Sequence, residues 1–175
     1  MKKKTINLKE ASFTQAINIS ALWCKEWDED LLSEEVLADR IAELIKTKNG
    51  LRGFFAYALS DKDCFLLDSL PFSLIYKLNE GGDPVVEIVI KNLIMSSAQI
   101  INHRRENNHD YEITSANISE RCKSILRHLK TKLVTKTVNQ VIKDLDTMGN
   151  SLNNSTKYDT EQKIFIKKQF FDIAQ

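Results

Sequence analysis

Glycine and proline are scarce in this chain, with five glycines and two prolines among 175 residues. A β-sandwich or barrel needs many tight turns, and these two residues supply most of them. Their scarcity argues against such folds and favours helices joined by short connections. A chain of this length fits one domain that buries about 70% of its unfolded surface, so it needs neither a disulfide nor a metal to fold.

Cysteine is also rare. Cys24, Cys64 and Cys122 are odd in number, widely spaced, and form neither a C-x-x-C pair nor a zinc-ligand pattern. This usage is typical of reduced thiols, so we expect a cytoplasmic protein. The start Met1 to Lys4 is basic like the front of a signal peptide, but the polar residues that follow interrupt any apolar h-region, so we expect no secretion.

Sequence signatures of catalysis are missing. The chain contains no glycine-rich phosphate loop, no G-x-S-x-G, no H-E-x-x-H and no Walker pattern. Asp61, Asp63 and Asp68 lack the central glycine and terminal glutamate of a calcium loop. The sequence therefore predicts no cofactor, no metal and no catalytic residue, and it favours a non-enzymatic protein. The net charge of +1 argues against a protein that coats polyanions, although a local basic cluster can still contact phosphate.

The longest apolar run follows Asp83 and predicts a buried central helix from Pro84 to Ile101. Proline suits the first helical turn, and Asp83 is expected to cap the exposed backbone N–H groups. Apolar residues fall on almost every side, so other helices must surround this one. Six polar residues within the run are too many for a lipid-facing helix, so we expect a soluble protein without a membrane partner.

Helical periodicity organises the residues before this run. A first helix is expected from Ser12 or Thr14 to about Asp28, and a second helix begins at Ser33 and is closed by Asn49-Gly50. The next apolar segment allows two interpretations. Residues 54–67 suit either short helices or a two-stranded piece, and we favour helices, with a break at residues 60–63. A further helix is expected between Pro71 and Gly81-Gly82.

After the central helix, residues 107–110 predict a polar loop. One long, bent helix is then expected from Thr114 or Ser115 to Gly149, because the apolar face changes side between Leu129 and Val138. Residues 1–149 thus make a helical core domain, residues 150–157 a polar linker, and residues 158–175 an amphipathic helix that packs on the core or on a partner. Asp159 and Gln162 suggest a capping box. The predicted fold is all-α, a single irregular bundle of six or seven helices.

The first functional hypothesis is partner binding. Both terminal helices carry more apolar side chains than one packed face consumes, and large exposed aromatics are typical of partner surfaces. The residues concerned are Ile19, Leu22, Trp23, Phe165, Phe170 and Phe171. The alternative is that the core grips both helices. We favour an interaction or regulatory domain that self-associates as a homo-oligomer or binds another protein.

The second hypothesis is nucleic-acid binding by a basic helix face. The residues are Arg104, Arg105, Arg127, Lys130, Lys132 and Lys136. Such charges can follow a phosphate backbone, or they can simply form the solvated side of a core helix. Aromatic residues are not interleaved with them, so stacking on single strands is not supported.

The third hypothesis is an enzyme or metal site in the His103–Asp110 loop. His103, Glu106, His109 and Asp110 combine metal-binding with acid–base groups, but their spacing matches no known ligand pattern. The alternative is a solvated helix end, in which the cations interact with the helix dipole.

Overall fold

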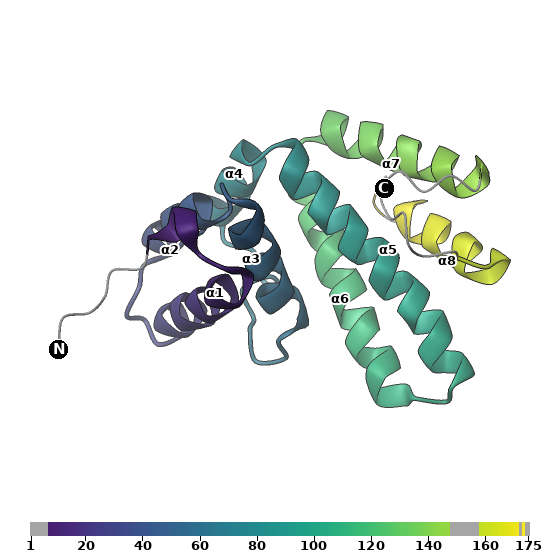
Figure 1. The fold of residues 1–175 in the computed structure, drawn as a ribbon, viewed down its shortest axis with the longest axis horizontal. Helices are drawn as coiled ribbons and strands as arrows, with labels where there is room; N and C mark the ends of the chain where they lie inside the picture. Colours follow the sequence, from purple (N-terminus) through teal and green to yellow (C-terminus); the bar gives the residue numbers. More distant parts are fainter. Residues whose placement is uncertain (1–6, 148–157, 172, 174–175) are drawn as a thin grey trace. The chain divides into compact units, whose positions relative to one another are not determined.

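The computed structural model describes residues 7–147, 158–171 and 173. Within these residues the chain contains eight α-helices and one short 3-10 helix, Leu8–Glu10, and no strand. The all-α prediction is confirmed. The chain divides into two compact units, residues 1–81 and 82–175, which are described separately below (Figure 1).

The first unit contains four α-helices: α1 (Phe13–Asp28), α2 (Glu34–Leu44), α3 (Lys48–Ser60) and α4 (Phe72–Glu80). Helix α1 packs on α3, and α2 packs on α4. Gly53 lets α1 and α3 approach closely, because a Cβ atom at this position would lie 2.4 Å from the Cβ of Ala16. Helices α1 and α3 therefore cross so closely that only glycine fits at position 53.

Side chains mark three helix starts in this unit. Ser12, Ser33 and Thr47 each accept a hydrogen bond from the backbone N–H three residues later. The predicted first helix is confirmed. The predicted end of the second helix is wrong, because α2 ends at Leu44 and Asn49-Gly50 lies inside α3, whose start Thr47 fixes.

The segment whose conformation the sequence left open is half helical. Residues 54–60 belong to α3, and residues 61–71 connect it to α4 without a strand. Cys64, Leu66 and Leu67 in this connection are buried, which explains its high apolar content. Pro71 precedes α4 as predicted, and α4 ends before Gly81.

The second unit contains α5 (Asp83–Arg105), α6 (His109–His128), α7 (Thr131–Thr147) and α8 (Thr160–Phe171). The other three helices all pack against α5, and α5 runs beside α6 along most of its length (Figure 1). The predicted central helix is therefore confirmed as α5. Of the described helices, only α5 is long and apolar enough to cross a membrane, but 61% of its most apolar stretch is buried, as in the core helix of a soluble protein.

The start of α5 differs from the prediction. Gly82, with φ 63°, is the N-cap, and Asp83 is already the first helical residue and does not cap. Glycine suits this left-handed backbone because it has no Cβ. Further along α5, the buried Ser96 and Ser97 donate hydrogen bonds to the carbonyl of Leu93, which satisfies their hydroxyl groups within the core.

The residues after α5 form two helices where one bent helix was predicted. Helix α6 begins at His109, not at Thr114 or Ser115, so His109 and Asp110 are helical rather than part of a loop. Leu129 adopts an extended backbone with ψ 164° and separates α6 from α7. The change of apolar face between Leu129 and Val138 thus marks a break, which raises the number of helices to eight. The predicted linker, residues 150–157, lies outside the described residues.

Candidate partner-binding site

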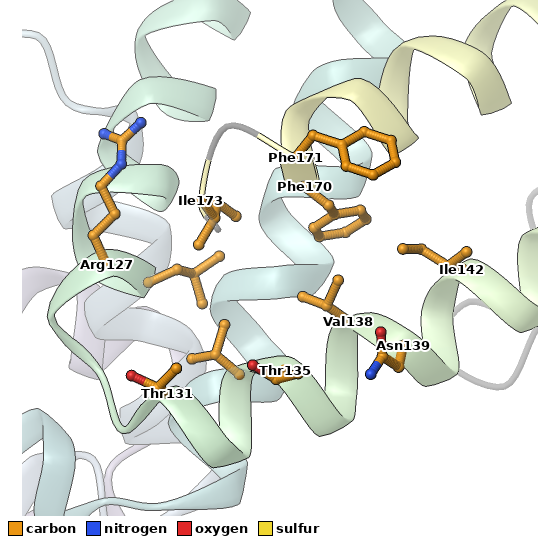
Figure 2. A pocket seen from close by; sticks show the side chains of 11 residues that line it. Arg127, Thr131, Thr135, Val138, Asn139, Ile142, Phe170, Phe171 and Ile173 are labelled. Carbon is orange, nitrogen blue, oxygen red and sulfur yellow. The ribbon is translucent and has the colours of Figure 1, made fainter. Parts of the chain in front are cut away.

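A pocket of about 210 Å³ opens in the second unit between the end of α6, helix α7 and the end of α8. Its apolar lining comprises Leu126, Val134, Val138, Ile142, Phe170, Phe171 and Ile173, and its polar lining comprises Arg127, Thr131, Thr135 and Asn139. Figure 2 shows Phe170 on α8 facing Val138 and Ile142 on α7, with Arg127 at the edge. The pocket is therefore an apolar hollow with a polar margin.

The break between α6 and α7 creates one wall of this pocket. Val134, Val141 and Leu145 are buried on the inner side of α7, whereas Val138 and Ile142 are only partly covered. A continuous α6–α7 helix would carry these residues away on another side. The extended Leu129 redirects the chain, so that α7 presents its second row of apolar side chains to α8.

The other wall depends on how α8 is attached to α5. Asp159 and Gln162 form the predicted capping box, each accepting a backbone N–H from the other at 3.0 Å. The buried Gln162 side chain also donates to the carbonyl of Ala98 at 3.3 Å and to Asn102 Oδ1 at 2.9 Å. Arg105 pairs with Asp159, at 2.7 Å, and with Glu161. Helix α8 therefore packs on its own chain.

The charge pair at this attachment shifts the ionisation of both partners. The side-chain hydrogen bonds from Arg105 are the main reason that the pKa of Asp159 falls to about 2, and a backbone N–H bond from Gln162 adds to them. The pKa of Arg105 is raised above its usual range, chiefly by Asp159 and then by Glu161. The attachment is thus fully charged at neutral pH.

Helix α8 is not cleanly amphipathic, contrary to the prediction. Gln162 and Gln169 are buried, and the Gln162 amide bonds to α5, while Ile164 and Phe171 are 64% and 65% exposed. Of the three predicted phenylalanines, Phe170 is buried and forms part of the pocket, Phe171 lines it from the exposed side, and Phe165 is half-buried outside it.

The candidates on α1 separate in a similar way. Ile19 is 7% exposed and belongs to the core. Helical periodicity did not predict its burial, because α1 is covered by both α2 and α3. Leu22 is 54% exposed. Trp23 is half-buried, and the guanidinium carbon of Arg40 lies over its indole ring, 5.8 Å from the ring centre. None of these three residues lines the pocket or the second hollow, in the first unit, that is described below.

The basic candidates fall into two groups. Arg104 pairs with Glu112 at 2.8 Å, and Arg105 holds α8, so both guanidinium groups have carboxylate partners within the chain. Lys130, Lys132 and Lys136 are exposed near the start of α7. Arg127 lines the pocket beside them. The structure therefore brings one basic candidate together with the two phenylalanines Phe170 and Phe171.

The histidine cluster does not form a ligand set. His103 Nδ1 lies 3.8 Å from Glu106, and His109 Nδ1 lies 3.7 Å from Glu112, both too long for hydrogen bonds. The His103 ring instead packs against Tyr111, with 5.5 Å between ring centres. Within the described residues, no three histidine, cysteine, aspartate or glutamate side chains are placed to hold a metal ion.

A second hollow, of about 430 Å³, lies in the first unit among α1, α3 and the connection after α3. Cys24 and Cys64 meet there, although 40 positions separate them in the sequence. The pKa of Cys24 is raised far above its usual range, first by a side-chain hydrogen bond with Cys64 and then by burial. A protonated thiol is a poor nucleophile, so the raised pKa argues against Cys24 as a reactive group.

Sequence reasoning missed the α7 side of the pocket. The lining residues Thr131, Thr135, Asn139 and Ile142 carry no chemical signature of a site, and the two threonines indicate only a poorly helical stretch. The change of apolar face near Val138 was the available signal, and treating it as a break would have exposed this side of α7.

Comparison with known proteins gives a family without an assigned activity. The family described as "Uncharacterised conserved protein UCP020893" matches residues 12–173 of the chain. No curated protein and no solved structure matches this chain.

Proposed function

Since the chain belongs to the family of the uncharacterised conserved protein UCP020893, whose description names no activity, we propose a function from its own residues. The protein is an interaction module, and its α6–α7–α8 pocket receives apolar side chains of a partner protein. The single observation that carries this proposal is the pocket itself, an apolar hollow whose margin includes the exposed Phe171.

The size and lining of the pocket favour a protein partner. Sites for drug-sized molecules usually enclose about 300–1,000 Å³, whereas this hollow of about 210 Å³ suits one or two side chains. Aromatic residues beside a small pocket are typical of the centre of a protein interface. Phe171 has only two side-chain torsions to fix, so ordering it costs little entropy on binding.

The cytoplasm is the compartment that we propose for this interaction. Cys24, Cys64 and Cys122 are all buried and form no disulfide. The pKa of Cys122 is raised by burial, and that of Cys24 by its hydrogen bond to Cys64 and by burial. Buried, protonated thiols suit a reducing environment.

Photo-cross-linking tests the proposed site. Benzoylphenylalanine introduced at position 171 should form an adduct with a partner protein in native cells, because the side chain lies at the pocket. The matched control is position 164 on the same helix, which is equally exposed but outside the pocket. Equal adducts at both positions, or none at position 171, would overturn the proposal.

Nucleic-acid binding is a second candidate, and one observation favours it. Residues 121–143 contain seven lysines and arginines and no acidic residue. If this segment contacts phosphate, replacing Arg127, Lys130 and Lys132 with glutamine should abolish binding to generic duplex DNA, and wild-type affinity should fall steeply with salt. A titration at two salt concentrations decides this, and an absence of wild-type binding at low salt removes the candidate.

A further inference from the structure

The first unit carries an acidic turn, defined here as residues 26–35. It contains six aspartates and glutamates and no basic residue. Asp28, Asp30 and Glu35 are exposed. Between them Leu31 is 72% exposed, the most exposed leucine described in the chain. Glu26 pairs with Arg40 and Glu29 with Lys25, so the turn presents one apolar side chain with three exposed carboxylates, Asp28, Asp30 and Glu35, near it in the sequence.

The backbone of this turn holds Leu31 in a fixed position. Asp30 has φ 56°, a left-handed conformation more usual for glycine. Its N–H bonds to the carbonyl of Trp27 at 3.0 Å, and the N–H of Leu31 bonds to the carbonyl of Glu26 at 2.8 Å. These two bonds make the Schellman motif that ends α1. In that motif the residue at the position of Leu31 usually packs back on the helix, but here it points into solvent.

The pocket has the opposite character. Its one charged lining residue is Arg127, and most of its lining belongs to the basic segment, residues 121–143. Lys130, Lys132 and Lys136 are exposed and each is adjacent in sequence to a lining threonine. An occupant that suits both features must carry an apolar side chain with negative charges around it. The acidic turn meets this description with residues of the chain itself.

We infer that the partner of the pocket is a second copy of this chain, whose acidic turn inserts Leu31 between α7 and α8. This inference rests on the proposed function and specifies its partner. The contact joins two different surfaces of the protein. An open assembly of any length therefore keeps one unoccupied turn at one end and one unoccupied pocket at the other. The assembly is therefore a head-to-tail chain or a closed ring, and it weakens with salt because charge attraction contributes to it.

Two variants, each with one altered surface, test this arrangement in the full-length protein. The turn variant combines Asp28→Asn with Leu31→Ser, and the pocket variant combines Lys132→Glu with Lys136→Glu. All four side chains are exposed, so both variants should fold, which far-UV circular dichroism checks. The control combines Lys48→Glu with Lys62→Glu, which changes the net charge as the pocket variant does, but on exposed sites of the first unit.

Sedimentation equilibrium gives the decisive result. Wild type and control should exceed the monomer mass of 20.1 kDa as concentration rises, whereas each variant alone stays monomeric. An equimolar mixture of the two variants should reach twice the monomer mass and stop there, because it has one intact turn and one intact pocket. A mixture that stays monomeric, variants that associate like wild type, or a monomeric wild type at near-millimolar concentration overturns the inference. Cross-linking at position 171 to a different protein would still support the proposed function.

Discussion

The two compact units begin their longest helices in different ways. In the first unit, Ser12, Ser33 and Thr47 supply side-chain caps to α1, α2 and α3. In the second, α5 begins at Gly82 and α6 at Asn108 without a side-chain cap. Of the four α-helices of the first unit, only α4, which follows Pro71, thus begins without a side-chain cap. In the second unit α8 has its capping box, but the two longest helices, α5 and α6, have no such cap and are held by packing against each other. Side-chain caps therefore mark the starts of the longer helices in the first unit, whereas the two longest helices of the second depend on tertiary packing.

The units also contain segments of opposite charge. The acidic turn lies in the first unit and the basic segment in the second, although the formal charges of the whole units are only −2 and +3. The apolar pocket adjoins the basic segment. The near-neutral total therefore says little about what each surface attracts.

The largest expected effect is in the core of the second unit. Ile90→Asp places a charge where the side chain is fully buried, which costs several kcal/mol against a total stability of about 5–15 kcal/mol. Both tryptophans lie in α1, so in urea their fluorescence reports the first unit while far-UV circular dichroism reports all helices. We expect loss of helical signal with the tryptophan midpoint retained.

Met95→Asp is the control on the same helix, because Met95 is 52% exposed, and it should keep the wild-type midpoint. If Ile90→Asp also keeps the midpoint in both signals, α5 is not the core of its unit.

The next effect is in the first unit, at the crossing of α1 and α3. Gly53→Ala adds a methyl group that meets Ala16, and we expect a loss of about 1–3 kcal/mol in the free energy of unfolding. Urea unfolding followed by tryptophan fluorescence measures it. Asn49→Ala, an exposed change in the same helix, should have little effect. Equal stability of the two variants would show that α1 and α3 do not approach as closely as described.

A matched pair of cap variants compares the two units directly. Ser33→Ala removes the side chain that accepts the N–H of Val36 and should cost about 1 kcal/mol. Asn108→Ala removes a side chain that makes no cap bond at the start of α6, so it should cost almost nothing. Equal losses of unfolding free energy in the two variants contradict the contrast between local caps and packing.

The smallest effect concerns acid. The pKa of Asp159 is about 2 in the folded chain and about 3.9 in an unfolded one, so its pair with Arg105 stabilises docked α8 at neutral pH. That contribution is lost as pH falls from about 4 to about 2, and it is small because the pair is exposed. Hydrogen exchange of α8 amides across this range should show falling protection in wild type and a flatter profile in Arg105→Gln. Identical profiles would remove Arg105 from the attachment.

The sequence predicted what local signals determine. Pro84 and the apolar run after it identified α5, and the caps Ser12 and Ser33 identified α1 and α2. The Asp159 and Gln162 capping box also followed from spacing alone. Each of these features depends on residues within a few positions of one another, which is the range that sequence patterns describe well.

Features that depend on distant residues could not be predicted. The burial of Gln162 requires the carbonyl of Ala98, and the contact of Cys24 with Cys64 requires α1 and the connection after α3 to meet. The pocket depends on the break at Leu129, which the sequence showed only as a change of apolar face. Two of its aromatic residues, Phe170 and Phe171, were nevertheless among the predicted partner-binding residues.

The central claim is that the pocket receives the acidic turn of another copy, and amide NMR spectra recorded during dilution test it most directly. From near-millimolar to micromolar concentration, we expect signals to move for the acidic turn and for the pocket residues on α7 and α8, together and with one dissociation constant. Signals of buried α3 residues should stay in place. Spectra that do not change with dilution, or changes confined to surfaces outside the turn and the pocket, would contradict the account.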